Sequence, residues 1–190
     1  MGFEFELKFR ATPEILQKIK KAYPGGEEIR MQTTYYDTAD GSLSAKRFTL
    51  RKRMENEESV CTLKTPGDGQ MRGEFETRCK EIAEAIPELC KLSGENIPTE
   101  ELVEVCGAKF TRYAKQLTLP DCMLELAVDE GILLGGGNEQ PLYEIEVELK
   151  SGSQESVTAF ARQLAKTYDL QEEERSKFAR ALEMATYGRF

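Results

Sequence analysis

The strongest constraint on the fold of this chain is a strict two-residue alternation of apolar and charged side chains. In residues 143–150, apolar side chains at every odd position alternate with three glutamates and one lysine. Successive side chains of a β-strand point to opposite faces, so this segment predicts a strand with one apolar and one charged face. Related alternation recurs at residues 3–9, 48–53, 60–64, 72–78 and 124–129, and a further strand that carries Arg112 is expected at 110–119. We therefore predict an α+β domain built on an antiparallel sheet.

Capping residues and helical periodicity predict helices between these strands. Thr12 before Pro13 is a typical helix start, and Pro24-Gly25-Gly26 is expected to end that helix. Ser153 is the expected N-cap of a later helix. Further helices are expected at about 79–92, 98–107 and 171–187, and the glycine-rich run 135–138 is expected to be a loop. No segment is long enough to act as a linker, so residues 1–190 are expected to form a single domain.

The polar faces of the predicted strands carry mostly carboxylates, arginines and lysines. Periodicity alone favours a solvated surface for such faces. The signs are sorted along the chain, however, because acids gather near its two ends and bases in its middle, which favours an enclosed site that holds a polyanion. The acids are Glu4, Glu6, Asp129, Glu144, Glu146 and Glu148, and the bases are Arg51, Arg53, Lys64, Arg72 and Arg112.

The chain contains no histidine, which excludes many reaction mechanisms. Neither a Ser-His-Asp triad, nor a Cys-His dyad, nor a His-ligated zinc or haem can be built. Clustered carboxylates select hard divalent cations such as Mg²⁺ or Mn²⁺, and arginine side chains bind phosphate oxygens in pairs. Together these residue types are typical of phosphoryl transfer, although the chain has no Gly-x-x-x-x-Gly-Lys-Ser/Thr phosphate loop.

Net charge and cysteine spacing limit the partners and the compartment. The formal charge of −8 argues against a general nucleic-acid or anionic-membrane surface. The five cysteines lie at least 11 residues apart and form no CxxC pair, and no apolar run reaches the roughly 18 residues of a membrane span. We expect reduced thiols and a cytoplasmic protein.

Several short motifs occur in an order that resembles a known family. Glu4-Phe5-Glu6-Leu7-Lys8 forms an E-x-E-x-K signature near the start of the chain. It is followed by Tyr35-Tyr36-Asp37-Thr38, Leu50-Arg51-Lys52-Arg53, Thr62-Leu63-Lys64, Arg72-Gly73-Glu74-Phe75-Glu76, Arg112, Glu125 to Asp129, Glu144-Ile145-Glu146-Val147-Glu148 and Ser176-Lys177. This set resembles the CYTH superfamily, the triphosphate tunnel metalloenzymes, and is most similar to its bacterial inorganic triphosphatases.

The resemblance implies a fold and a set of site residues. The expected fold is a closed, eight-stranded antiparallel β-barrel that forms a tunnel, with the helices packed outside. The expected ligands are a small-molecule triphosphate and Mg²⁺ or Mn²⁺, with no nucleic-acid or membrane partner and with a homodimer as a candidate assembly. The metal would be bound by Glu4, Glu6, Asp129, Glu144, Glu146 and Glu148, with Glu146 and Glu148 favoured among the last three. The triphosphate would contact Lys8, Arg51, Arg53, Lys64, Arg72, Arg112 and Lys177, and the catalytic groups would be Glu146, Glu148 and Lys8.

The expected reaction is metal-dependent hydrolysis of inorganic tripolyphosphate to pyrophosphate and phosphate. A thiamine triphosphatase, a nucleoside triphosphatase, a class IV adenylyl cyclase and a non-enzymatic polyphosphate or nucleotide binder remain as alternatives. The lack of histidine argues against the cyclase and the lack of tryptophan against thiamine recognition. Clustered acids argue against pure polyanion binding, since binding alone does not require them.

Overall fold

A computed structural model describes residues 2–67, 72–98 and 101–187, which form ten strands in one sheet together with five helices. The strands are β1 (Gly2–Glu4), β2 (Glu6–Arg10), β3 (Glu27–Thr38), β4 (Thr49–Glu55), β5 (Glu58–Pro66), β6 (Arg72–Arg78), β7 (Leu102–Leu119), β8 (Cys122–Gly135), β9 (Asn138–Gly152) and β10 (Gln171–Glu172). The helices are α1 (Pro13–Ala22), α2 (Ser42–Ala45), α3 (Ile82–Ser93), α4 (Gln154–Tyr168) and α5 (Lys177–Tyr187).

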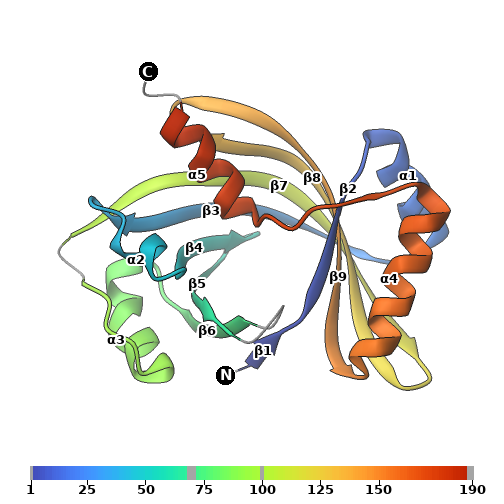
Figure 1. The fold of residues 1–190 in the computed structure, drawn as a ribbon, viewed down its shortest axis with the longest axis horizontal. Helices are drawn as coiled ribbons and strands as arrows, with labels where there is room; N and C mark the ends of the chain where they lie inside the picture. The colour runs from blue at the N-terminus through green and yellow to red at the C-terminus, as the bar shows by residue number, and fades with distance from the viewer. Residues whose placement is uncertain (1, 68–71, 99–100, 188–190) are drawn as a thin grey trace.

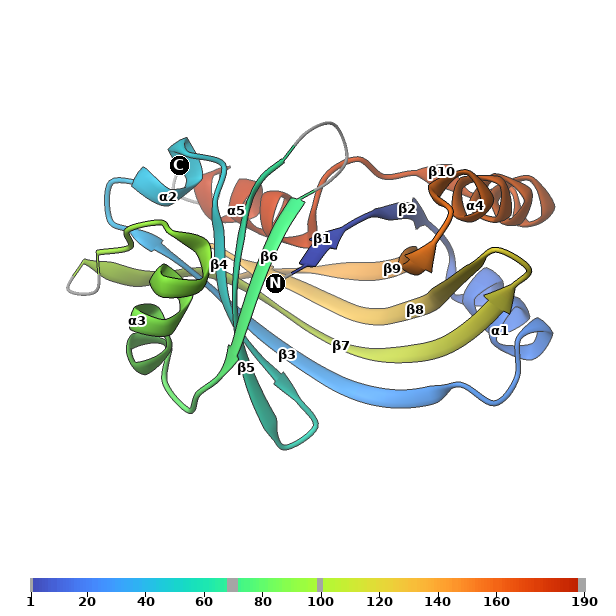
Figure 2. The ribbon, with the colours of Figure 1, turned by 90° about the horizontal axis from the view of Figure 1, so that it is seen from below.

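The sheet is strongly curved, with antiparallel neighbours in the order β1-β6-β5-β4-β3-β7-β8-β9-β2-β10 (Figures 1 and 2). The prediction of an eight-stranded closed barrel is wrong, because this order is linear, with β1 and β10 at its two edges. The reason lies at the N-terminus. The chain pairs with β6 through β1, passes Phe5, and then pairs with β9 through β2, so a covalent connection rather than a hydrogen-bonded ladder joins the two ends.

Three predicted elements also differ from the structure. Residues 27–38 form the central strand β3, which the sequence analysis did not predict. The helix expected at 98–107 is wrong, since β7 begins at Leu102 and pairs with β3 along that strand's whole length. The last helix begins at Lys177 rather than near 171, because residues 171–172 pair with β2 as a short edge strand.

Local signals at helix starts and turns are confirmed. Thr12 accepts a hydrogen bond from the Ile15 amide at the start of α1, and Ser153 accepts one from the Ser156 amide at the start of α4. The two-residue turn between β8 and β9 places Gly136 and Gly137 at positive φ, a conformation that glycine adopts without strain.

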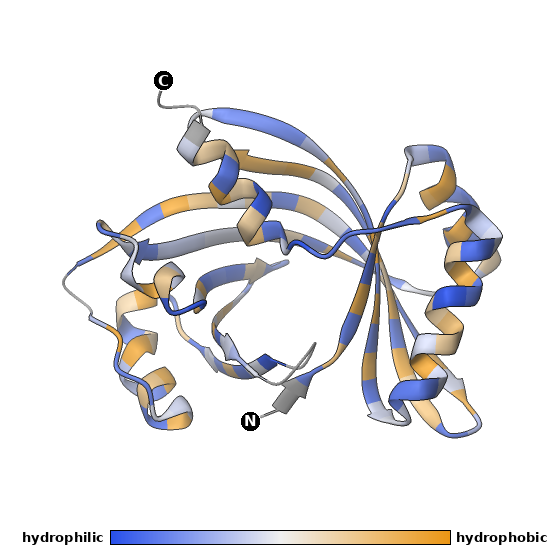
Figure 3. Ribbon diagram, in the orientation of Figure 1, coloured by the Kyte–Doolittle hydropathy of each residue, from blue (hydrophilic) through white to orange (hydrophobic). Residues whose placement is uncertain are grey.

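The apolar faces of the strands are covered by helices on the outer side of the sheet. Helices α1 and α4 pack on β2, β8 and β9, where Leu16, Ile145 and Val157 are fully buried. Helix α3 packs on β5 and β6, and there Cys61 and Leu89 are fully buried. Figure 3 shows the hydrophilic and hydrophobic bands that alternate along the strands. No helix in the described parts of the chain is long and apolar enough to cross a membrane.

Helix α5 lies on the concave side of the sheet, which corrects the expectation that all helices pack outside. It contacts β7 and β8, and its Ala181 is buried among Met31, Phe110 and Leu133. Phe110 belongs to the same face of β7 as the charged Arg112, so this apolar cluster fills one end of the concavity. The cluster positions the first residues of α5 against the charged faces of the strands.

A buried carboxylate holds the segment that leads into α5 against the edge of the sheet. Glu173 is 3% exposed, and it accepts hydrogen bonds from Arg10 Nε at 2.7 Å and from the Arg175 amide at 3.0 Å. Burial acts to raise the pKa of Glu173, but these hydrogen bonds outweigh it and lower the pKa to about 2. The folded state therefore favours the ionised form of Glu173.

Glu173→Gln is expected to lower the free energy of unfolding at pH 7 by on the order of 1–3 kcal/mol, the range for hydrogen bonds to a buried charged group. The folded-state pKa lies below the ordinary value of 4.5, so this contribution is present above about pH 4.5 and is lost as the pH falls toward 2. Urea unfolding of the wild type and of Glu173→Gln at pH 7 and at pH 3 measures the difference in free energy of unfolding, with Glu174→Gln at an exposed position as the control. An equal loss at both pH values would contradict the assignment.

Candidate functional site

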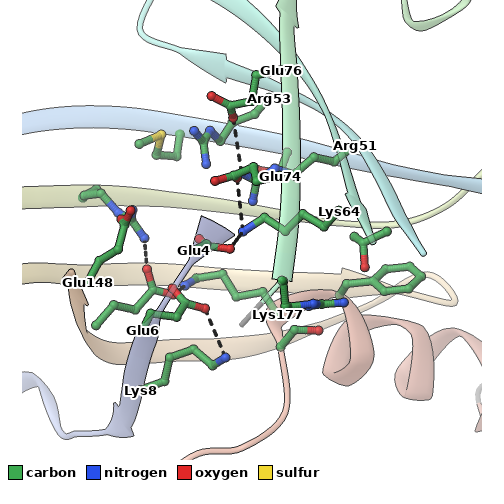
Figure 4. A pocket seen from close by; sticks show the side chains of 18 of the residues that line it. Glu4, Glu6, Lys8, Arg51, Arg53, Lys64, Glu74, Glu76, Glu148 and Lys177 are labelled. Carbon is green, nitrogen blue, oxygen red and sulfur yellow. Dashed lines mark hydrogen bonds and ion pairs between the residues drawn. The ribbon is translucent and has the colours of Figure 1, made fainter. Parts of the chain in front are cut away.

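A cavity of about 280 Å³ lies on the concave face of the sheet, and the charged faces of the strands point into it. Its lining comes from all of β1 to β9 and from the start of α5, as Figure 4 shows for 18 of the side chains. The charged alternation of the sequence therefore reflects a polar cavity on the concave face of the sheet rather than a fully solvated surface.

Among the residues that the structure describes, positive and negative side chains line the cavity in equal numbers. The eight bases are Lys8, Arg51, Arg53, Lys64, Arg72, Arg112, Lys150 and Lys177, and the eight acids are Glu4, Glu6, Glu55, Glu74, Glu76, Glu125, Glu146 and Glu148. Of the site residues expected from the sequence, only Asp129 and Glu144 are not in the lining.

A basic wall formed by Arg51, Arg53 and Lys64 lies on β4 and β5. Arg51 Nη2 lies 3.4 Å from Glu74 Oε1, and Lys64 Nζ lies 3.3 Å from the same oxygen and also pairs with Glu4. Arg51 Nε is buried and has no hydrogen-bond partner among the described residues. Burial and the nearby Arg51 cation lower the pKa of Arg53, although Glu55 pairs with it. An anion in the cavity would relieve this crowding of cations.

A second group of carboxylates lies on β1, β2, β8 and β9, and one of them, Glu4 on β1, pairs with Lys64 of the basic wall. The strand register places Glu6 opposite Glu148 and Glu148 opposite Glu125. Burial raises the pKa of Glu148, and the Glu4 and Glu125 carboxylates add to this rise, while Lys150, 2.8 Å away, opposes it. Lys64 pairs with Glu4, Lys8 lies 3.2 Å from Glu6 Oε1 and Lys150 pairs with Glu148, so the four carboxylates of this group contact three lysines.

The chemistry of this donor set suits a hard divalent cation. The group of carboxylate oxygens that lie within 4.8 Å of one another in the described residues is that of Asp129, Glu144 and Glu146, so Glu4, Glu6 and Glu148 would have to converge on a bound ion. Glu4, Glu6 and Glu148 offer carboxylate oxygens from three neighbouring strand segments that face one cavity. Mg²⁺ and Mn²⁺ prefer such ligands, and the mutual repulsion of the carboxylates would fall when a cation binds.

Three further acids lie at the floor of the site and are already paired with cations. Asp129 and Glu144 are both 0% exposed, and together with Glu146 they form the group whose carboxylate oxygens lie within 4.8 Å of one another. Lys177 Nζ lies 2.8 Å from Asp129 Oδ2 and 2.6 Å from Glu146 Oε1, and it also contacts Glu144. The group therefore holds Lys177 between three carboxylates.

Two arginines complete this network, which we call the floor network (Asp129, Glu144, Glu146, Arg112, Lys177 and Arg180). Arg112 donates to both Asp129 oxygens, at 2.8 and 2.7 Å, and also to Glu146, while Arg180 pairs with Glu144. Three carboxyl groups and three cationic side chains thus contact one another in a buried place, where charges are tolerated only when they are paired.

The protonation equilibria of the floor network follow from this pairing. Burial lowers the pKa of an amine, but Asp129, Glu144 and Glu146 raise the pKa of Lys177 well above its ordinary value. Burial likewise acts to raise the pKa of Glu146, but Lys177 and Arg112 outweigh it and hold that pKa well below its ordinary value. Burial raises the pKa of Glu144 to about 7, against the lowering effect of Lys177.

Sequence reasoning missed several residues of the site. Lys150 continues the parity of the three glutamates on β9 and could have been found from it, and Arg180 follows Lys177 by three residues, one helical turn later. Glu125 and Glu76 were not among the expected site residues, yet both line the cavity. Tyr35, Phe110 and Phe178 also line it, and a charge pattern gives no signal for such aromatic side chains.

Comparisons with known proteins agree with this architecture. The chain is 30% identical over 172 residues to an inorganic triphosphatase of Haemophilus influenzae, a match that covers 85% of this chain and 49% of that protein. The chain thus spans about half the length of this curated relative.

Solved structures share the fold. A putative adenylyl cyclase from Hippeastrum, described as having a dominant triphosphatase activity, superposes with a TM-score of 0.69 at 21% identity, covering 100% of this chain and 97% of that one. A putative adenylate cyclase from Bacillus halodurans superposes with a TM-score of 0.63 at 20% identity, covering 93% and 96%.

The family model of the CYTH domain matches residues 2–182, which is nearly the whole chain. The match includes the E-x-E-x-K segment, the basic wall and the floor network. The chain belongs to the CYTH domain family.

Proposed function

We propose that this domain hydrolyses a linear triphosphate, with inorganic tripolyphosphate as the substrate and pyrophosphate and phosphate as the products, in the presence of Mg²⁺ or Mn²⁺. The observation that carries the proposal is the cavity on the concave face of the sheet, in which four arginines and four lysines lie together with carboxylates among the described residues. The relative from Haemophilus influenzae, named an inorganic triphosphatase, supports the same reaction.

The balance of charge in the cavity supports a metal-dependent reaction. Its eight acids and eight bases cancel formally, so a bare triphosphate would bring several uncompensated negative charges into a partly buried place. A divalent cation that enters with the phosphates would offset them. Polyphosphate binding alone would be served better by a cavity without the carboxylates of β1, β2 and β9.

In this proposal the carboxylates that face the cavity hold the metal. Glu4, Glu6 and Glu148 are its ligands, and a bound divalent cation would supply neutralisation of phosphate charge and a lowered pKa of bound water. Glu146 lies at the border, since its two oxygens already contact Lys177 and Arg112. Glu146 could accept a proton or bind a metal only after its contact with Lys177 or with Arg112 is broken.

The remaining residues act on the phosphates. Arg51 and Arg53 donate N–H groups to phosphate oxygens, and Lys64 and Lys8 add point charges. Arg112 would contribute its positive charge and its Nη1 group, because its Nε and Nη2 already donate to Asp129 and Glu146. Arg72 and Lys177 reach the cavity from β6 and α5. Asp129 and Glu144, which were expected to bind metal, would instead fix the positions of Arg112 and Lys177. Charge that develops on the transferred phosphoryl group would thus meet donors that are already oriented.

We also propose that the ligand is a small-molecule triphosphate, with no nucleic-acid or membrane partner, and that the protein is cytoplasmic. All five cysteines are free thiols in the structure, which supports a reducing compartment.

Release of phosphate by the purified protein tests the proposal. With Mg²⁺ or Mn²⁺, tripolyphosphate is expected to be hydrolysed with a higher kcat/KM than ATP or thiamine triphosphate, and EDTA is expected to abolish the activity. Formation of cyclic AMP and pyrophosphate from ATP would establish a cyclase instead. Tight binding of tripolyphosphate with no turnover under any metal would overturn the hydrolase in favour of a binding protein.

A further inference from the structure

A second pocket lies directly beside the cavity and shares part of its wall. This side pocket has a volume of about 420 Å³ and lies between α2, the start of β4 and the outer turns of α5. Four residues line both spaces and therefore form the partition between them. They are Thr49, Arg72, Ser176 and Phe178.

The two spaces differ in chemistry. The cavity is lined mainly by ionic side chains, whereas the side pocket contains Phe48, Ala179 and Leu182, with Arg47 and Glu183 at its polar parts. An inorganic triphosphate would gain nothing from such apolar surface. A ring system attached to a triphosphate, such as a base with its sugar, is apolar on its faces and polar at its edges, and it matches this lining.

Phe178 is the large apolar member of the partition, and it is fixed from several sides. It is 8% exposed, and its ring packs against the ring of Tyr35 with 5.1 Å between centroids and an angle of 44° between planes. The carbonyl oxygen of Phe178 lies 3.9 Å from Cys106 Sγ. The preceding residue, Lys177, is held in the floor network, so the start of α5 has little freedom to move the ring aside.

We infer that Phe178 limits the choice of substrate by separating the triphosphate cavity from the side pocket, so that an organic group on the terminal phosphate cannot enter the side pocket past its ring. This inference rests on the proposed hydrolysis of a triphosphate and extends it to the choice between inorganic and organic substrates. If so, removal of the Phe178 ring is expected to join the cavity to the side pocket and to admit nucleoside triphosphates.

A graded series at position 178 tests the inference. The ratio of kcat/KM for ATP to kcat/KM for tripolyphosphate is expected to rise at least tenfold in Phe178→Ala and by a smaller factor in Phe178→Leu, which refills part of the space. Because Lys177 is adjacent, both activities of a variant can fall together, and the ratio is unaffected by such a common loss. An unchanged ratio in both folded variants, or a wild-type protein that already uses ATP as well as tripolyphosphate, would overturn the inference.

Leu182→Ala is the matched control, because Leu182 lines the side pocket but not the cavity. It enlarges the side pocket without opening the partition, so its ratio is expected to equal that of the wild type. If the wild-type protein turns over no triphosphate, the same ratio is measured as dissociation constants for ATP and tripolyphosphate by calorimetry. The ratio of dissociation constants then tests the role of Phe178 even if the proposed hydrolysis is not observed.

Discussion

Replacing Lys177 by methionine is expected to lower the free energy of unfolding by about 3–5 kcal/mol, the range seen when one partner of a buried ion pair is removed. The amine is buried within 2.8 Å of Asp129 Oδ2 and 2.6 Å of Glu146 Oε1, and it also contacts Glu144. Methionine fills a similar volume but leaves these carboxylates with only Arg112 and Arg180. Phosphate release is expected to fall to background, since the cavity also loses one of its cations. Urea unfolding and a phosphate-release assay measure the two effects.

A second substitution separates the stability effect from the activity effect. Adding Glu144→Gln to Lys177→Met removes one of the uncompensated charges, so about 1–3 kcal/mol of stability is expected to return while turnover remains absent. If the double variant is no more stable than the single one, the floor network does not hold Lys177 in the way described.

Lys150→Met is the matched control for this pair. Lys150 also lines the cavity and lies 2.8 Å from Glu148, but its side chain is 36% exposed. Exposed ion pairs contribute little, so the loss of stability is expected to stay below about 1 kcal/mol. A loss as large as that of Lys177→Met would show that burial does not distinguish the two lysines.

The sequence predicts which face of a strand each side chain occupies better than it predicts which strands pair with one another. The alternation in residues 143–150 correctly separates the buried apolar side of β9 from the glutamates, because the two-residue period of a strand is a local property. Thr12 and Ser153 likewise mark helix starts through contacts within one turn. Closure of the sheet depends instead on which strand each half of the N-terminal segment meets, and no local pattern contains that information.

Strand β3 shows why the alternation also misses an element. Its cavity side carries Ile29, Met31, Thr33 and Tyr35, so the apolar and polar faces are reversed relative to the neighbouring strands. The reversal exists because α5 covers that part of the concave face with apolar side chains such as Ala181. A tertiary contact with residues about 150 positions away thus decides the pattern.

Depth in the site is equally hard to predict. Parity places Glu144, Glu146 and Glu148 on one face, but it does not show that Glu144 lies under Lys177 and Arg180 while Glu148 faces the cavity. The difference arises where α5 crosses the sheet. The resemblance to the CYTH family indicated the residue set, and the packing of α5 divides that set into cavity-facing and floor residues.

That division predicts a large effect for Glu148→Gln. The rate of tripolyphosphate hydrolysis is expected to fall by more than about 100-fold, because the substitution removes a proposed metal ligand. Substituting residues that only hydrogen-bond to metal ligands already lowers metal affinity or activity by about 10–100-fold. The free energy of unfolding is expected to stay the same or to increase. Glu148 lies opposite both Glu6 and Glu125, and removing its charge relieves repulsion between these carboxylates. Opposite effects on activity and stability are typical of a group retained for function. Initial rates across a Mn²⁺ titration, together with urea unfolding, measure both.

Glu125→Gln provides the comparison within the same row of strands. Its Oε2 accepts a hydrogen bond from Gln116 Nε2 at 2.6 Å. Glu125 lies on β8, one strand further from β2 than Glu148, and it is therefore not among the proposed ligands. This variant is expected to keep its rate within about threefold and its Mn²⁺ dependence unchanged, because neither the charge of Glu148 nor its place beside Glu4 and Glu6 is altered. If instead Glu125→Gln loses as much activity as Glu148→Gln, the metal lies one strand further along the sheet than proposed. If Glu148→Gln keeps the wild-type rate and Mn²⁺ affinity, the assignment of Glu4, Glu6 and Glu148 as the metal site is wrong, whatever the reaction of the domain.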